Sequence, residues 1–175
     1  MRTLMLFRHA KAVPARSGMR DRDRSLDSRG LKEAPQIGAY MAHHRLVPDH
    51  ALVSPARRTR ETWTLAAQAF NPAPATSFEE RIYEASPETL LDVIRERDTA
   101  NPVLVVVGHN PTLHAVALML IASGDLIARE KLREGLPTSG LVIIEFAFES
   151  WRKLHPQAGR LSHFVTPRSL EAATD

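Results

Sequence analysis

Short apolar segments, each followed at once by polar or basic side chains, recur along the chain. Residues 3–7 (TLMLF), 50–53 (HALV) and 103–107 (VLVVV) are almost wholly apolar. Such continuous runs are typical of strands that are covered on both faces in a parallel sheet. Residues 140–148 and 161–165 are further strand candidates, and we expect the second of them at an edge of the sheet.

Two of these segments lead directly into a predicted helix. Ser54 offers a side-chain N-cap, and Pro55 suits the first helical turn. Asn110 and Pro111 have the same relationship to a second helix, which we expect to end at Gly124. The apolar stripes that mark these helices are Thr59, Thr62, Trp63, Ala66 and Phe70 in the first, and Leu113, Val116, Ala117, Leu120 and Ile121 in the second.

Two further helices are predicted elsewhere. Ser86 and Pro87 begin one of them by the same pattern of N-cap and proline. Between Gly30 and Leu46 apolar residues recur at helical spacing, and Pro35 should begin or kink this helix because it lacks a backbone N–H. Strands that alternate with helices predict an α/β fold, a three-layer α/β/α sandwich around a mainly parallel sheet.

The bulk properties indicate one globular domain over residues 1–175, without a linker or an internal repeat. No cysteine is present, which excludes disulfides and thiolate chemistry. The apolar runs are too short for a secretion signal or a membrane span, so we expect a soluble, cytoplasmic protein with no membrane partner. The sequence does not indicate the oligomeric state.

The net charge of +3 raises the question of nucleic acid binding. The densest basic stretch, residues 16–24, alternates arginines with Asp21 and Asp23, which indicates a solvated loop. Aromatic side chains make up only 6% of the chain, and the basic residues are scattered. Nucleic acid is therefore not expected as a partner, because its binding needs a broad basic face with interleaved aromatics.

Basic and polar side chains follow three of the predicted strands. Because parallel strands bring their carboxyl ends to one edge of the sheet, we expect these side chains to lie close together. The N-termini of the following helices add positive potential at the same edge. Arginine forks match the oxygens of phosphate, so this edge is expected to bind a phosphate group. The residues concerned are Arg8 and His9, then Ser54, Arg57 and Arg58, then His109 and Asn110.

Two of the eight histidines have a setting that suggests chemistry. His9 and His109 follow strands and adjoin a basic or helix-capping residue, where one can act as nucleophile and the other as hydrogen-bond donor. His109 and His114 are too far apart in sequence to share one helical face as metal ligands, so no metal or other cofactor is expected. The remaining six are expected to be structural or at the surface: His43, His44, His50, His114, His155 and His163.

Three sequence blocks resemble the signature of the histidine phosphatase (phosphoglycerate mutase-like) superfamily. They are LFRHAKA at 6–12, SPARRTRET at 54–62 and VVVGHNP at 105–111. Within this superfamily the chain is similar to the SixA-like phosphohistidine phosphatases, in which alanine follows the histidine where most members have glycine. The segments DRSLDSRGLKEA, LPTSG and GRLSHFVTPRSL also resemble blocks of that branch, and the resemblance extends over residues 1–170.

The resemblance implies a role for each of the principal residues. His9 would be the nucleophile that carries the phosphoryl group in a phosphohistidine intermediate. Arg8, Arg58 and His109 would hold the three equatorial oxygens of the transferring group. The spacing within its block favours Arg58 over Arg57, which would be a charge at the rim. We also expect the nearby arginines to lower the pKa of His9.

Four further residues are candidates for the site. Glu84 is either the acid that protonates the leaving group, as in many superfamily members, or a carboxylate favoured at the entry of the next helix. Ser54 is a candidate phosphate donor, but its N-cap role already accounts for its presence. Asn110 and Thr138 would line the phosphate pocket by analogy with the family.

These observations lead to one preferred function and two alternatives. We expect a metal-independent phosphatase that acts on a protein phosphohistidine, because so short a chain leaves little material for a lid over the site. The first alternative is a phosphatase for a small phosphorylated metabolite, with the loop at 16–24 as its specificity element. The second is a non-catalytic module that only binds phosphate groups.

Overall fold

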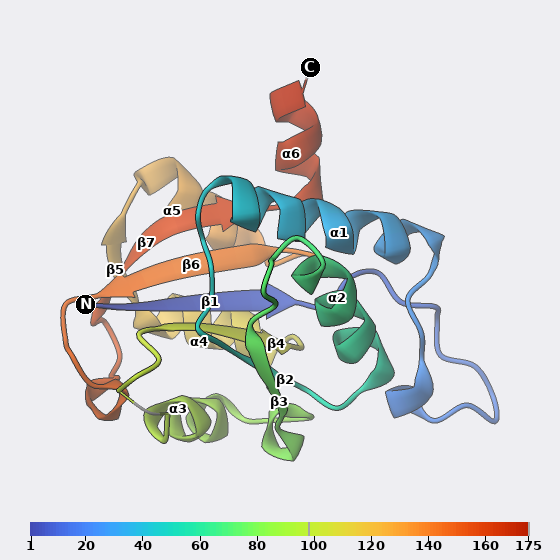
Figure 1. The fold of residues 1–175 in the computed structure, drawn as a ribbon, viewed down its shortest axis with the longest axis horizontal. Coiled ribbons are helices and arrows are strands. Elements are labelled where there is room, and N and C mark those ends of the chain that lie inside the picture. The colour runs from blue at the N-terminus through green and yellow to red at the C-terminus, as the bar shows by residue number, and fades with distance from the viewer. Residues whose placement is uncertain (98, 175) are drawn as a thin grey trace.

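Seven strands form one sheet in the computed structural model, which describes residues 1–97 and 99–174. Their order across the sheet is β3-β2-β4-β1-β6-β7-β5 (Figure 1). The strands are β1 (Arg2–Arg8), β2 (His50–Val53), β3 (Ala75–Phe78), β4 (Val103–Gly108), β5 (Ile121–Gly124), β6 (Leu141–Phe146) and β7 (Gly159–Val165).

The sheet is mainly parallel, as predicted. β1 to β4 run in the same direction, whereas β6 runs antiparallel to both of its neighbours. The prediction of an edge strand at 161–165 is wrong, because β7 contains these residues and lies between β6 and β5. The strand at this edge of the sheet is β5. It follows an apolar helix directly, so no turn residue marks its start in the sequence.

Helices cover both faces of this sheet, which confirms the three-layer prediction. One face carries α1 (Ser28–His43) and α2 (Arg57–Ala67), with α6 (Pro167–Thr174) against α1, and the other carries α3 (Pro87–Arg95), α4 (Thr112–Leu120) and α5 (Leu126–Glu134). Because successive strand side chains point to opposite faces, Leu4 and Leu6 of β1 belong to the core beneath α3 and α4. Met5 and Phe7 belong to the core beneath α1 and α2.

The first helix begins earlier than its proline indicated. Asp27 is the N-cap of α1, and its carboxylate accepts a hydrogen bond from the Gly30 N–H at 2.9 Å. Pro35 therefore lies inside the helix and does not begin it. The start predicted for α3 is confirmed, since the Ser86 hydroxyl accepts from the Thr89 N–H at 3.2 Å.

The second helix begins later than predicted. α2 starts at Arg57 with Ala56 as its N-cap residue and without a side-chain cap. The predicted N-cap role of Ser54 is therefore wrong, and Pro55 lies before the helix. The Ser54 hydroxyl instead lies 2.7 Å from the His109 ring and accepts from the Ala56 N–H, before the helix begins, at 3.4 Å.

The fourth helix is shorter at both ends than predicted. α4 starts at Thr112, and Pro111 rather than Asn110 is its N-cap residue. The Asn110 oxygen still accepts from a backbone N–H of the first turn, that of His114, at 3.3 Å. The helix ends at Leu120, because the residues up to Gly124 pair with β7 as strand β5.

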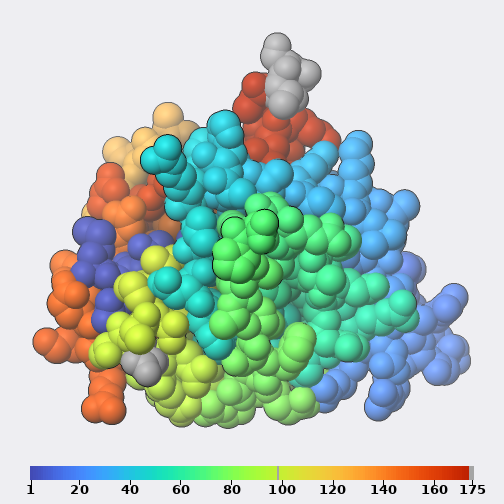
Figure 2. All heavy atoms as spheres, in the orientation of Figure 1, coloured from blue at the N-terminus to red at the C-terminus, as the bar shows by residue number. Residues whose placement is uncertain are grey.

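The carboxyl ends of β1, β4 and β2 lie side by side. Arg8 is the register partner of Gly108, and Val53 is the partner of Val107. Figure 2 shows the face in front of this sheet, where the connection after α1 (cyan) packs beside the green residues of α2 and β3.

None of the helices in residues 1–97 and 99–174 has the length and apolar character that crossing a bilayer requires.

Candidate active site

His9 is buried directly after β1, where the backbone holds it from two sides. Its N–H donates to the Gly108 carbonyl at 3.1 Å, and its carbonyl accepts from the Ser139 N–H at 3.0 Å. The ring Nδ1 lies 2.8 Å from the Ala10 carbonyl oxygen. Because a carbonyl oxygen only accepts, Nδ1 carries the proton in this contact. The lone pair of Nε2 is therefore available for attack on an electrophile.

His109 lies opposite this ring, at a centroid distance of 5.4 Å from it. Its Nδ1 lies 3.3 Å from Nη2 of Arg58, and its Nε2 lies 2.7 Å from the Ser54 hydroxyl. A guanidinium only donates, so Nδ1 accepts in this arrangement and Nε2 carries the proton. Ser54 is fully buried and therefore acts as a fixed support of the His109 ring.

Two arginines complete the site, and the outer end of each is anchored. Nη1 of Arg8 donates to the Leu136 carbonyl at 3.0 Å, and Nη1 of Arg58 donates to the Asp21 carbonyl at 2.9 Å. The Nε groups of both arginines are buried and have no hydrogen-bond partner among the described residues. A buried donor without an acceptor costs about 1–3 kcal/mol, so both N–H groups are unsatisfied in this structure.

The electrostatics keep both histidines neutral. The pKa of His9 is lowered to about 4, chiefly by burial and also by the charges of Arg58, Arg8 and Arg24, while the hydrogen bond to the Ala10 carbonyl acts to raise it. Burial and then Arg58 lower the pKa of His109 to about 3. The predicted direction for His9 is confirmed, although desolvation contributes more than the arginines. At neutral pH the first ring is thus in the form that a nucleophile requires.

Comparison with known proteins agrees with this geometry. Residues 4–88 match the model of the histidine phosphatase superfamily, branch 1. An uncharacterised protein of Mycobacterium tuberculosis is 35% identical over 164 residues, which are 93% of this chain and the whole of that relative. The chain belongs to the histidine phosphatase superfamily.

Solved structures of superfamily members share the fold over nearly the whole chain. A candidate phosphohistidine phosphatase SixA of Agrobacterium tumefaciens is 33% identical, with a TM-score of 0.77 over 95% of this chain and 98% of that one. The SixA candidate of Nakamurella multipartita is 24% identical, with a TM-score of 0.81 over 95% of this chain and 96% of that one. The first of these places this superfamily member near SixA-like proteins, and the second is a likeness of fold.

The remaining predicted residues have varied settings. Arg57 is exposed and pairs with Glu61 at 3.6 Å, outside the cluster of His9, His109 and the two buried arginines. Glu84 is exposed with a positive φ of 56°, just ahead of α3. The Asn110 amide donates to the Leu136 carbonyl at 2.8 Å, the same oxygen that anchors Arg8. Thr138 is half-buried.

Sequence reasoning missed two residues beside the site. Asp21 was expected in a solvated loop, yet its carboxylate accepts from Nη2 of Arg58 at 3.0 Å and from the Tyr83 hydroxyl at 2.5 Å. The Tyr83 hydrogen bond is the largest cause that holds the pKa of Asp21 well below its usual range. The pKa of Tyr83 is raised to about 12, first by burial and second by its hydrogen bond to Asp21. The alternating charges at 16–24 gave only a weak signal, because they are equally typical of a solvated loop.

A third contact from α2 also escaped sequence reasoning. Thr62 was expected only as part of a helical stripe, but its hydroxyl donates to the Arg58 carbonyl at 2.7 Å and accepts from the Ala10 N–H at 2.9 Å. This hydroxyl ties the loop after His9 to the helix that carries Arg58. The distance between nucleophile and arginine is therefore set by a buried side chain with less than 1% exposure.

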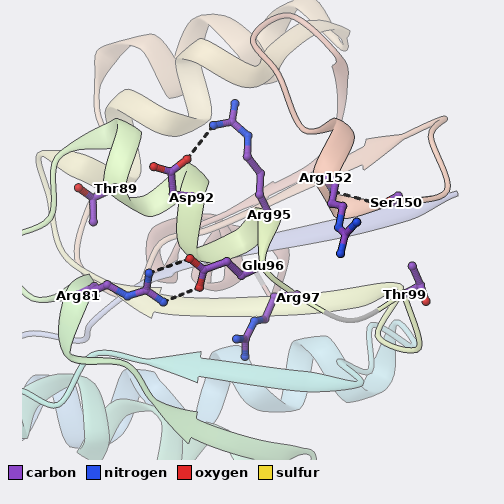
Figure 3. A pocket seen from close by; sticks show the side chains of 9 residues that line it. All are labelled: Arg81, Thr89, Asp92, Arg95, Glu96, Arg97, Thr99, Ser150 and Arg152. Atoms are coloured by element: carbon purple, nitrogen blue, oxygen red, sulfur yellow. Dashed lines mark hydrogen bonds and ion pairs between the residues drawn. The ribbon is translucent and has the colours of Figure 1, made fainter.

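A separate basic groove of about 990 Å³ lies along α3 (Figure 3). The four arginines that line it are Arg81, Arg95, Arg97 and Arg152. Arg81 pairs with Glu96 at 2.7 Å and Arg95 with Asp92 at 3.1 Å, so acids of the groove offset part of its charge. None of the predicted site residues lines this groove. Within residues 1–97 and 99–174, no three His, Asp or Glu side chains gather as they would to hold a metal ion.

Proposed function

We propose that this protein is a phosphatase that removes phosphoryl groups from phosphohistidine side chains of proteins. The observation that carries the proposal is the setting of His9. Its ring is neutral, its Nε2 lone pair is available, and two buried Nε–H donors without acceptors accompany it. A neutral nucleophile beside unpaired cationic donors suits a phosphoryl group, which needs attack at phosphorus and charge stabilisation at its oxygens.

The reaction would proceed in two steps. In the first, Nε2 of His9 attacks phosphorus, a P–N bond forms, and the bond to the leaving group breaks with its electron pair on that group. In the second, water attacks phosphorus from the vacated side, and the P–Nε2 bond breaks. The electron pair returns to Nε2, the water proton passes to phosphate or solvent, and inorganic phosphate leaves. Arg8, Arg58 and His109 would hold the equatorial oxygens in both steps.

The exposed position of Glu84, the candidate general acid, is consistent with a phosphohistidine substrate. Glu84 is exposed, just ahead of α3. An imidazole is a better leaving group than an alkoxide, so phosphohistidine makes little demand on a strong acid. The Agrobacterium tumefaciens relative at 33% identity bears a phosphohistidine phosphatase name, which supports the same substrate class.

A small phosphorylated metabolite is the second candidate substrate. The observation in its favour is that the 16–24 loop reaches the site through Asp21, whose carboxylate contacts Arg58. A loop in that position can contact the non-phosphate part of a small molecule. Loss of turnover for one metabolite upon loop deletion, with protein phosphohistidine unaffected, would favour this candidate.

The test compares substrates and one nucleophile variant in the presence of excess chelator. A protein phosphorylated on histidine, a panel of phosphometabolites and para-nitrophenyl phosphate are each assayed for phosphate release. We expect the highest kcat/KM for the phosphohistidine protein, and a loss of at least about a thousandfold in His9→Ala. His155→Ala is the matched control, because this exposed histidine lies outside the site. Unchanged release by His9→Ala would overturn the nucleophile assignment, and turnover of one metabolite alone would overturn the substrate class.

A further inference from the structure

A single carboxylate in the 16–24 loop joins three segments at the edge of the site. Asp21 begins the 3₁₀ turn Asp21–Asp23, and its Oδ1 accepts from Nη1 of Arg24 at 3.0 Å. Its Oδ2 accepts from the Tyr83 hydroxyl at 2.5 Å and from Nη2 of Arg58 at 3.0 Å. The loop, the segment before α3 and helix α2 are thus connected through one side chain.

Asp21 accepts two hydrogen bonds from Arg58, and together these bonds determine the orientation of the guanidinium. The Asp21 carbonyl accepts from Nη1 at 2.9 Å, while the carboxylate of the same residue accepts from Nη2. Both terminal nitrogens are therefore engaged, and Nη2 also reaches the His109 ring. The Nε–H of Arg58 is buried and has no partner among the described residues.

We propose that Asp21 is a positioning residue of the phosphate site, which orients the guanidinium of Arg58 and, through Arg58, the ring of His109. The inference rests on the proposed function, because the oriented groups matter only if a phosphoryl group is transferred between them. Arg58 is buried at 6% exposure, so water has little access to replace the acceptor that the Asp21 carboxylate provides. Asp21 itself does not touch the reacting atoms.

The charge of Asp21 makes its role separable from simple anion binding. A carboxylate beside a phosphate site repels the bound anion, and therefore weakens binding of phosphate in the ground state. The orientation of Arg58 matters most in the transition state, where charge on the transferring oxygens must be met without reorganisation. Removal of the charge should consequently affect turnover and anion binding in opposite directions.

The test is Asp21→Asn, which keeps the shape and removes the charge. We expect kcat for para-nitrophenyl phosphate to fall about 10- to 100-fold, while inorganic phosphate inhibits at an equal or lower concentration than in the parent. Asp23→Asn is the matched control, since it removes the same charge from the same turn but pairs only with Arg20 at 2.9 Å. We expect this control to stay within twofold of the parent in both measurements.

Tyr83→Phe also weakens the contacts of the Asp21 carboxylate, but it leaves the charge of that carboxylate in place. It removes one donor to Asp21 but leaves the pair with Arg58, so we expect a decrease in kcat of about threefold, in the same direction as Asp21→Asn. An NMR readout does not depend on activity. The Nε–H signal of Arg58 should be slow to exchange in the parent and in Asp23→Asn, and fast in Asp21→Asn.

The outcomes separate this inference from the proposed function. If the parent hydrolyses no substrate, the proposed function fails, while the NMR comparison still decides whether Asp21 orients Arg58. If the parent is active and Asp21→Asn resembles Asp23→Asn, the inference alone is overturned. It is also overturned if Asp21→Asn loses turnover and phosphate binding in parallel, because that pattern indicates a generally loosened site.

Discussion

The hydroxyl of Ser54 can either accept a hydrogen bond from the His109 ring or donate one to it. With Nδ1 accepting from Arg58, Nε2 donates to Ser54. To bind a phosphate oxygen, Nδ1 must itself become a donor, and a neutral ring then needs a donor opposite Nε2. A hydroxyl satisfies both arrangements by rotation, which a carbonyl or a carboxylate cannot do. In the proposed reaction, Ser54 would thus support the ring both before and during phosphate binding.

Replacement of Ser54 by alanine tests this support. We expect Ser54→Ala to lower kcat about tenfold and the free energy of unfolding by about 1 kcal/mol, because the buried hydroxyl loses its bond to the His109 ring and its longer bond to the Ala56 N–H. Steady-state kinetics and urea denaturation measure the two effects. Ser77→Ala is the control, since its hydroxyl lies 2.8 Å from the His50 ring, away from the site. Equal kcat in the two variants would contradict the role of Ser54.

At the same scale, the sequence predicts the residues that follow strands better than those in loops. The positions of His9 and His109 follow from two apolar segments whose carboxyl ends must meet in a parallel sheet. Asp21 reaches the site through a 3₁₀ turn, and Tyr83 through the segment between β3 and α3. No periodicity governs such segments, so their direction depends on tertiary contacts that the sequence pattern does not contain.

Helices α1 and α2 pack so closely that one position in α1 has no room for a side chain. A Cβ atom at Gly38 would lie 2.2 Å from the backbone oxygen of Ala66. This contact involves backbone on both sides, so relief requires a shift of one helix against the other. Because α2 carries Arg58, the packing of Gly38 affects the geometry of the site from a distance.

We expect Gly38→Ala to destabilise the fold by about 1–3 kcal/mol, through overpacking of this helix contact. The sign is diagnostic, because glycine to alanine in an open helix position stabilises by about 1 kcal/mol. Thermal or urea unfolding measures the change. Gln36→Ala, at an exposed position of the same helix, should cause no loss. A stabilised Gly38→Ala variant would contradict the close contact.

Elements with a strong apolar pattern were the ones that the sequence revealed. β1, β2, β4 and β6 contain continuous buried runs and were predicted. The strand β3 has mostly exposed residues, and α5 has one buried residue, Leu132, so neither has enough apolar residues for a clear pattern. The side-chain cap was predicted correctly at Ser86 and wrongly at Ser54, whose hydroxyl lies against the ring of the distant residue His109.

The two neutral histidines link the stability of the whole molecule to pH. An unfolded histidine has a pKa near 6.5, whereas burial lowers the pKa of His9 to about 4 and that of His109 to about 3. Between these values the unfolded chain binds protons that the folded chain does not. The free energy of unfolding should therefore be largest above about pH 6.5 and decrease as the pH falls toward about 4.

Urea denaturation at about pH 7 and about pH 5 measures this dependence, in a range where carboxylates remain largely ionised. In His9→Gln one of the two groups no longer titrates, so we expect a smaller loss of stability between the two pH values than in the parent. His155→Gln, at an exposed position, should retain the parent slope. Equal slopes in His9→Gln and the parent would contradict burial of a neutral ring.

The unpaired Nε–H groups of Arg8 and Arg58 also have an evolutionary consequence. Shorter apolar side chains in their place would relieve the buried donors, so selection for heat resistance alone would favour their loss. Their retention would then report selection for turnover, since the proposed reaction needs their charge beside the transferring group. At these two positions thermal stability and catalytic activity therefore favour different side chains. A library of variants screened for thermal stability should be screened for activity in parallel.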